Sequence, residues 1–298
     1  MALVHVNADD GAAPAEAARV AGTLDADAPI IVMIHGYRFS PASPSHDPHR
    51  HILAMQPDGR ARRVLSWPRA LGIEPATSQD LAVGFGWEAR GSLRRAYASA
   101  EDSASALARI VDRLAETANR PVALIAHSLG ARVALGCLHH VSAGSLGRTI
   151  LLAGAEFRTT AEQALSTPAG RRAEIINVTS RENDLFDFAL EMLLSAGRRQ
   201  ALGFGLSQPR RNWVDVQIDD ARTLAELAQL GFPMDPHALR MCHWSPYLRR
   251  GVFDFYRTAL RQPWALPLGM LRLRLPQPTA PRWSRLFATT QDAGGLRA

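Results

Sequence analysis

The sequence contains no lysine, so all of its basic residues are arginine or histidine. Schiff-base chemistry, attachment of pyridoxal phosphate and a lysine-bearing phosphate loop each need an ε-amino group, so these function classes are excluded. The net charge of +6 is modest for 298 residues and is spread along the chain. Because no recognition motif accompanies the arginines, we expect no nucleic-acid partner.

Cysteine is scarce, and the two residues Cys137 and Cys242 cannot form a disulfide framework. The first residues lack a basic region followed by an apolar stretch, so we expect no secretory signal. Charged residues interrupt the most apolar segment, so we expect no integral membrane segment. The sequence therefore favours a cytoplasmic protein, and a peripheral membrane contact through the C-terminal tail is the less favoured alternative.

Strand-like and helix-like patterns alternate along the chain, which predicts an α/β fold with a mostly parallel central sheet and helices on both faces. Strands are expected at 30–34, 63–66, 122–126, 149–152, 174–178 and 214–218. The clearest helix spans 93–114, where apolar residues recur at spacings of three and four.

No repeat or linker divides the chain, so we expect one domain over residues 1–298. Its core spans about 30–260, preceded by an N-terminal edge segment at 1–29 and followed by a C-terminal extension at 264–298. Prolines among the leucines and arginines of that extension disfavour a long helix and favour an extended tail lying on the domain.

The segment Val-Ala-Leu-Ile-Ala-His-Ser-Leu-Gly at 122–130 has the pattern of a nucleophile elbow. An apolar strand must turn sharply at Ser128 into a helix, and the small residues Ala126 and Gly130 permit the tight bend. The helix that begins after Ser128 directs its unpaired N–H groups and its positive dipole end toward a reacting oxygen. A serine that only caps a helix is the alternative, and it leaves the two small residues unexplained.

A serine nucleophile needs a base and an acid that orients the base, and in this architecture both follow the serine along the chain. The strand at 174–178 leads into a loop with three candidate acids. Asp184 is favoured because it lies a few residues beyond the strand, whereas Asp187 is expected in the next helix and Glu182 in solvent.

The favoured base is His243, which directly precedes a helix expected from Ser245 to about Leu260. A loop histidine there can present one ring nitrogen to Ser128 while the other donates to Asp184. His237 is the fallback base.

The oxyanion hole is expected from the loop after the strand at 30–34, where His35 and Gly36 let the backbone bend toward the serine. One donor would be the backbone N–H of Tyr37, and the other that of Leu129, the residue after the nucleophile.

Together, His35-Gly36, the elbow at 126–130, Asp184 and His243 resemble the α/β-hydrolase superfamily from about Ile30 to Leu260. The elbow is similar to that of bacterial esterase and lipase-like serine hydrolases. The resemblance implies cofactor-free hydrolysis of esters, thioesters or amides through an acyl-enzyme, and it leaves the substrate open. An acyltransferase with the same triad and a catalytically silent binding module are the alternatives.

The apolar segment after Asp184, from Phe186 to Leu194, is expected either to pack in the core or to line the mouth of the site. In the second case a small acyl or aryl ester fits best as substrate. The histidines at 46, 49 and 51 are expected at the surface or the pocket rim, because their mixed spacing among prolines disfavours a metal site.

Overall fold

The computed structural model describes residues 3–10, 13–58, 64–73, 80–236 and 241–284. Within these ranges seven strands form one sheet, and every neighbouring pair of strands is parallel. The strand order is β1-β3-β2-β4-β5-β6-β7. The strands are β1 (Leu3–Asn7), β2 (Ile30–Ile34), β3 (Leu81–Gly86), β4 (Val122–His127), β5 (Leu146–Leu152), β6 (Glu174–Thr179) and β7 (Trp213–Gln217).

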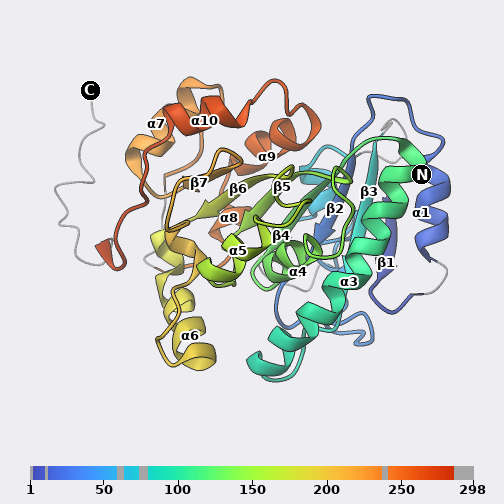
Figure 1. Cartoon of the computed structure of the whole chain (residues 1–298), viewed down its shortest axis with the longest axis horizontal. Coiled ribbons are helices and arrows are strands. Elements are labelled where there is room, and N and C mark those ends of the chain that lie inside the picture. The colour runs from blue at the N-terminus through green and yellow to red at the C-terminus, as the bar shows by residue number, and fades with distance from the viewer. Residues whose placement is uncertain (1–2, 11–12, 59–63, 74–79, 237–240, 285–298) are drawn as a thin grey trace.

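Helices cover both faces of the sheet, as the predicted fold class requires (Figure 1). Successive residues of β2 point to opposite faces, so Val32 packs into one core layer and Met33 into the other. The first layer contains α1 (Ala13–Ala21), α3 (Leu93–Ala118), α4 (Gly130–Cys137) and α5 (Arg158–Ala164). The second contains α2 (Trp67–Ala70), α7 (Ala221–Gln229), α8 (Ser245–Leu248), α9 (Val252–Arg261) and α10 (Leu268–Arg274).

The predicted helix at 93–114 is α3, and its two ends are capped. The side chain of Ser92 accepts a hydrogen bond from the backbone N–H of Arg95 at the start. Asn119 ends the helix in the left-handed conformation at φ +51°. Capping and an apolar stripe agree here, which is why periodicity alone predicted this helix.

The strand predicted at 63–66 is wrong, because the described residues 64–66 are not extended in the sheet. The strand between β2 and β4 in sequence is instead β3, at Leu81–Gly86. The sequence did not predict it, because Gly84 and Gly86 weaken a strand pattern. Both glycines serve close packing against the edge strand β1 and its neighbours. A Cβ at Gly86 would lie 2.3 Å from Oδ1 of Asn7.

The helix predicted from Ser245 to Leu260 is two helices, α8 and α9, separated at Gly251. Gly251 has φ +89°, and a Cβ there would lie 2.2 Å from the carbonyl oxygen of Pro233. A positive φ cannot continue a right-handed helix, so the helix ends before Gly251, and glycine is the residue that adopts this backbone without strain.

The C-terminal extension begins with α10, so the extended tail expected there is only partly correct. After α10 the chain runs along the edge strand β7, where Gln277 donates to the carbonyl of Asp215 at 2.8 Å. The backbone N–H of Ala280 then donates to Oε1 of Gln217 at 2.7 Å. The extension thereby covers the open edge of the sheet.

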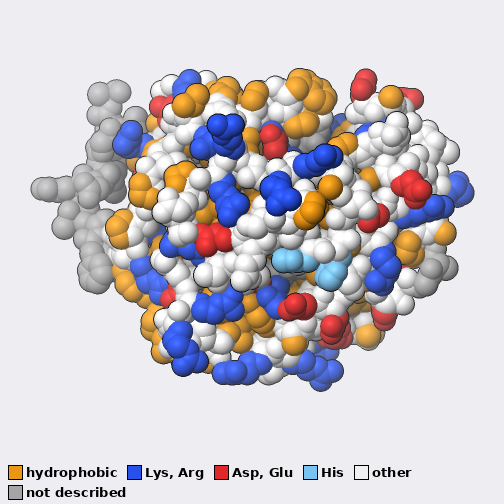
Figure 2. All heavy atoms as spheres, in the orientation of Figure 1, with side chains coloured by type: hydrophobic (Ala, Val, Ile, Leu, Met, Phe, Trp, Pro, Cys, Tyr) orange, Lys and Arg blue, Asp and Glu red, His pale blue; other side chains and the backbone are white. Residues whose placement is uncertain are grey.

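The N-terminal segment supplies the other edge strand, β1, followed by α1 against the first layer. The arginine side chains are scattered over the displayed face among acidic and apolar ones (Figure 2). Among the described helices, none combines the length and the apolar composition needed to cross a bilayer.

Candidate active site

Ser128 follows β4 in the left-handed conformation, with φ +54°. A serine in this region is strained, and surrounding hydrogen bonds must hold it there. Its N–H donates to the carbonyl of Leu152 at 3.0 Å. Its own carbonyl accepts from Ala131 at 3.0 Å and from Ala155 at 2.9 Å. The bend predicted at Ser128 is therefore present and is fixed on both sides.

Two glycines allow the loop after β2 to touch the bend. A Cβ at Gly130 would lie 2.6 Å from the carbonyl oxygen of His35, and one at Gly36 would lie 2.7 Å from Cβ of Ser128. Position 130 therefore does require a small residue. The clash that a larger side chain would make is with the end of β2 and the loop after it, and not with the residue before Ser128.

The buried ring of His35 locks this loop. Its Nε2 accepts from the backbone N–H of Trp87 at 3.0 Å, while Nδ1 donates to the carbonyl of Gly36 at 3.0 Å. The indole N–H of Trp87 donates to the carbonyl of His35 at 3.0 Å. Burial lowers the pKa of His35 to about 4, so the ring is neutral with a fixed tautomer.

The two predicted oxyanion donors lie on segments that meet at Ser128. Leu129 directly precedes α4, and Tyr37 follows Gly36, whose backbone lies against the serine. No described protein group accepts the backbone N–H of either residue. Within the described residues both N–H groups are therefore uncommitted, and the positive end of the α4 dipole lies beside that of Leu129.

His243 lies directly before α8, and its ring is oriented by an amide. Its Nδ1 is 2.6 Å from Oδ1 of Asn183. An amide oxygen only accepts hydrogen bonds, so Nδ1 carries the proton and Nε2 keeps its lone pair. Burial, with a smaller contribution from His127, lowers the pKa of His243 well below its usual value. The imidazole is thus a neutral base.

The prediction that Asp184 orients His243 is corrected by these contacts. The carboxylate of Asp184 accepts from the backbone N–H of Trp283 at 2.6 Å and faces the guanidinium of Arg181 at 3.3 Å. A 3₁₀ turn, η2 (Arg181–Asn183), follows β6 and places Asn183 rather than Asp184 toward the ring. The fallback base, His237, lies outside the described residues.

The loop of His243 is tied to the elbow and to η2. Nε2 of His127 donates to the carbonyl of His243 at 3.1 Å, and the two rings lie 4.6 Å apart. The N–H of Cys242 donates to the carbonyl of Glu182 at 2.9 Å. Glu182 is buried and pairs with Arg249 at 3.1 Å, which corrects its expected exposure to solvent.

Residues 15–150 match the model of a family described as alpha/beta hydrolase of unknown function (DUF900). The matched region contains β2, β3, β4 and most of β5, and with them the loop of His35 and the elbow of Ser128. The match and the all-parallel sheet show that the chain has the α/β-hydrolase fold. No curated protein sequence matches it.

Helix α6 (Asp184–Ser195) projects beyond the end of the sheet (Figure 1). Unlike an ordinary surface helix, it buries polar side chains and exposes large apolar ones. Four of its polar side chains are buried: Asp184, Asp187, Glu191 and Ser195. Five large apolar ones are exposed: Leu185, Phe186, Phe188, Met192 and Leu193.

The exposed apolar face of α6, defined by those five residues, reaches His243. The ring of Phe186 stacks on the imidazole with the centroids 4.6 Å apart, and Trp244 lies edge-on to Phe186 at 6.3 Å. Of the two expectations for this apolar segment, proximity to the site is the one these contacts favour. The segment is not simply core, because Phe186 remains 38% exposed.

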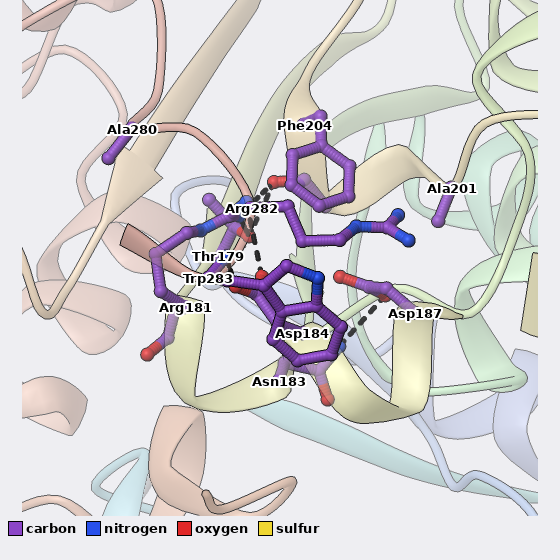
Figure 3. A network of polar contacts seen from close by, with 12 residues as sticks. Thr179, Arg181, Asn183, Asp184, Asp187, Ala201, Phe204, Ala280, Arg282 and Trp283 are labelled. Atoms are coloured by element: carbon purple, nitrogen blue, oxygen red, sulfur yellow. Dashed lines mark hydrogen bonds and ion pairs between the residues drawn. The ribbon is translucent and has the colours of Figure 1, made fainter. Parts of the chain in front are cut away.

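The buried face of α6 lies in a polar network (Figure 3). We named two of its carboxylates as candidate acids from the sequence but did not assign Asn183, Arg181 or Arg282 to the site. Nδ2 of Asn183 donates to Oδ1 of Asp187 at 2.9 Å. Arg181 and Arg282 lie beside the carboxylates of this network (Figure 3). The helical spacing of Asp184, Asp187 and Glu191 was the available signal for a shared polar face.

The histidines outside this site make other contacts. His49 stacks on His5 with centroids 4.3 Å apart, and its Nε2 lies 2.7 Å from Oδ1 of Asn7. Burial lowers the pKa of His49 to about 3. His46 is exposed beside two serines. Within the described ranges, no group of three or more metal-ligating side chains is arranged to hold an ion.

Proposed function

We propose that this α/β hydrolase is a serine hydrolase that cleaves carboxylic esters, and by the same chemistry thioesters, through an acyl-enzyme on Ser128. The observation that carries the proposal is the left-handed backbone of Ser128 at φ +54°, adjacent to two unclaimed backbone N–H groups. Strain of this kind is retained where a side chain must be presented in one direction. A serine that merely capped a helix would have no need of it.

In the proposed reaction, Oγ of Ser128 attacks the carbonyl carbon while Nε2 of His243 accepts the hydroxyl proton. The N–H groups of Tyr37 and Leu129 donate to the oxygen that becomes negative. The bond to the alcohol then breaks, and His243 returns its proton to the leaving oxygen. Water then attacks the acyl carbon while His243 takes its proton. The bond from the acyl carbon to Oγ breaks, His243 returns the proton to Oγ, and the free acid leaves.

Asn183 takes the role that the sequence suggested for Asp184. By accepting from Nδ1 it fixes the tautomer that leaves Nε2 unprotonated. A neutral amide can serve this purpose, as in other nucleophile–histidine–asparagine arrangements. The apolar face of α6 beside the imidazole favours acyl or aryl esters over small polar ones.

Labelling with a fluorophosphonate probe tests the proposal directly. We expect the wild-type protein to react at Ser128, Ser128→Ala to remain unlabelled, and His243→Ala to react far more slowly. A series of p-nitrophenyl esters of increasing chain length would then define the acyl group. A folded wild-type protein that neither labels nor turns over any ester would instead support the silent binding module.

The same labelling cannot separate a hydrolase from an acyltransferase, because both form the acyl-enzyme. Product analysis with an added alcohol or amine does so. We expect the free acid to predominate, and a predominance of transferred product would support the acyltransferase.

A further inference from the structure

The amide of Asn183 connects His243 to a buried carboxylate. Its Oδ1 lies 2.6 Å from Nδ1 of the imidazole. Its Nδ2 donates to Oδ1 of Asp187 at 2.9 Å, the contact that Figure 3 shows between these two residues. We propose that Asp187 is a positioning residue that acts on His243 through the Asn183 amide. This inference rests on the proposed serine hydrolase function.

The direction of the amide follows from its two neighbours. An ionised carboxylate only accepts hydrogen bonds, so the NH₂ group of Asn183 must face Asp187 and its oxygen must face the ring. A negative charge on Asp187 polarises the amide and makes its oxygen a stronger acceptor. The imidazolium that forms when His243 takes the serine proton is then stabilised, although no carboxylate among the described residues hydrogen-bonds to the ring.

Asp187 is held against this amide by close packing. Its side chain is buried, and a Cβ at Gly203 would lie 2.1 Å from its Oδ2. Gly203 belongs to η3 (Leu202–Phe204), which closes over the carboxylate. The carboxylate therefore cannot move away from Asn183 without displacing a neighbouring backbone.

Charged groups face Asp187 from each of the other segments around it. Arg181 comes from η2, Asp184 from the preceding turn of α6, and Arg282 from the C-terminal extension. Glu191, one turn further along α6, is neutralised by its ion pair with Arg282 at the edge of the network. The surroundings therefore mix both signs of charge.

Burial raises the pKa of Asp187, Arg181 lowers it and Asp184 raises it again, and the net result is a pKa of about 7. Asp187 is accordingly neutral below pH 7 and ionised above it. Because only the ionised form stabilises the imidazolium, kcat/KM should rise through pH 7. The base itself is already unprotonated there, since the pKa of His243 lies well below its usual value.

The decisive comparison uses two substitutions that conserve side-chain shape. Asp187→Asn keeps an acceptor for the Asn183 amide and removes the charge, so kcat should fall roughly 10- to 100-fold with little change in KM. The rise of kcat/KM near pH 7 should disappear. The exchanged variant Asn183→Asp/Asp187→Asn returns a carboxylate to the ring and should recover most of the lost kcat.

Asp184→Asn is the matched control, because it removes one charge from the same network without a contact to Asn183. It removes a like charge near Asp187, so the rise should persist and move to lower pH. If Asp187→Asn does not fold, Asn183→Ala tests the same connection by deleting the amide, and it should also abolish the rise.

Two results would overturn the inference while leaving the hydrolase intact. One is a rise near pH 7 that survives in folded Asp187→Asn or Asn183→Ala. The other is an exchanged variant no more active than Asp187→Asn. Failure of the proposed function itself is seen separately, as a wild-type protein that the fluorophosphonate does not label.

Discussion

His127 donates from Nε2 to the backbone carbonyl of His243 across 3.1 Å, although 116 positions separate them in the chain. The residue next to the proposed nucleophile therefore holds the loop of the proposed base. The contact uses the protonated nitrogen of a neutral ring, because burial lowers the pKa of His127 to about 4. The end of β4 thus carries the proposed nucleophile and also anchors the loop of the proposed base.

Replacing His127 should reduce activity without removing any reacting group. In His127→Ala the loop of His243 loses its anchor, and a displacement of about 1 Å costs up to roughly 100-fold in turnover. His127→Gln can still donate a hydrogen bond and should retain more activity. Steady-state kinetics with one ester, alongside thermal unfolding, checks this. Equal kcat in the alanine variant and the wild type would contradict it.

The strained backbone at Ser128 predicts that two inactive variants of this residue differ in stability. Both Ser128→Ala and Ser128→Gly remove the hydroxyl and should lower turnover by several orders of magnitude. Only glycine adopts φ +54° without strain, so the glycine variant should be more stable than the alanine variant by about 1 kcal/mol. Urea unfolding of the two variants measures this difference, and an alanine variant of equal or greater stability would argue against stored strain.

The apolar face of α6 should affect substrate binding only where it meets the imidazole. Phe186→Ala removes the ring that stacks on His243 and should raise KM for long-chain or aryl esters. Leu193 is 54% exposed on the same helix, so Leu193→Ala should change stability by less than about 0.5 kcal/mol. Kinetics over an ester series compares the two, and an equal effect of both variants would exclude a local role for Phe186.

The buried histidines predict lower stability in acid. Burial lowers the pKa values of His35 and His127 from 6.5 to about 4, so the unfolded chain binds protons that the folded protein does not. Above pH 6.5 neither the folded nor the unfolded chain protonates these histidines, so they do not lower the free energy of unfolding. As the pH falls from 6.5 toward 4, only the unfolded chain takes up protons, and the free energy of unfolding decreases. Asp187, whose pKa is raised, offsets part of this loss. Urea unfolding at several pH values should show the decline, and constant stability would contradict it.

The elbow and most of the sheet were predictable because local sequence determines them. Runs of β-branched and aliphatic residues specify β2, β4 and β6, and the small residues around Ser128 specify the bend. Strand β3 escaped prediction because its glycines are required by contacts with β1, which are distant in sequence.

The identity of the residue that orients His243 could not be read from the chain. Asn183 and Asp184 are adjacent, and consecutive residues of a tight helical turn point about 120° apart. A single 3₁₀ turn therefore decides which of them meets the ring. Asp184 was chosen because a carboxylate usually orients a catalytic histidine. That argument does not indicate which residue the turn directs toward the ring. The sequence did predict that Asp187 lies in a helix. It could not predict that the side chain is buried, because the nearby charges of Arg181 and Arg282 come from other segments.

The segment after α10 ends its described course against α6, where Trp283 donates to Asp184 and Arg282 pairs with Glu191. Its arginine supplies one of the positive charges that balance three buried carboxylates on a single helix. Shortening the chain before Arg282 would admit water to those carboxylates and let α6 rotate its acids outward. We expect a protein trimmed in this way to keep Ser128, His243 and Asn183 in its sequence and still to lose the hydrogen bond between Asn183 and the imidazole.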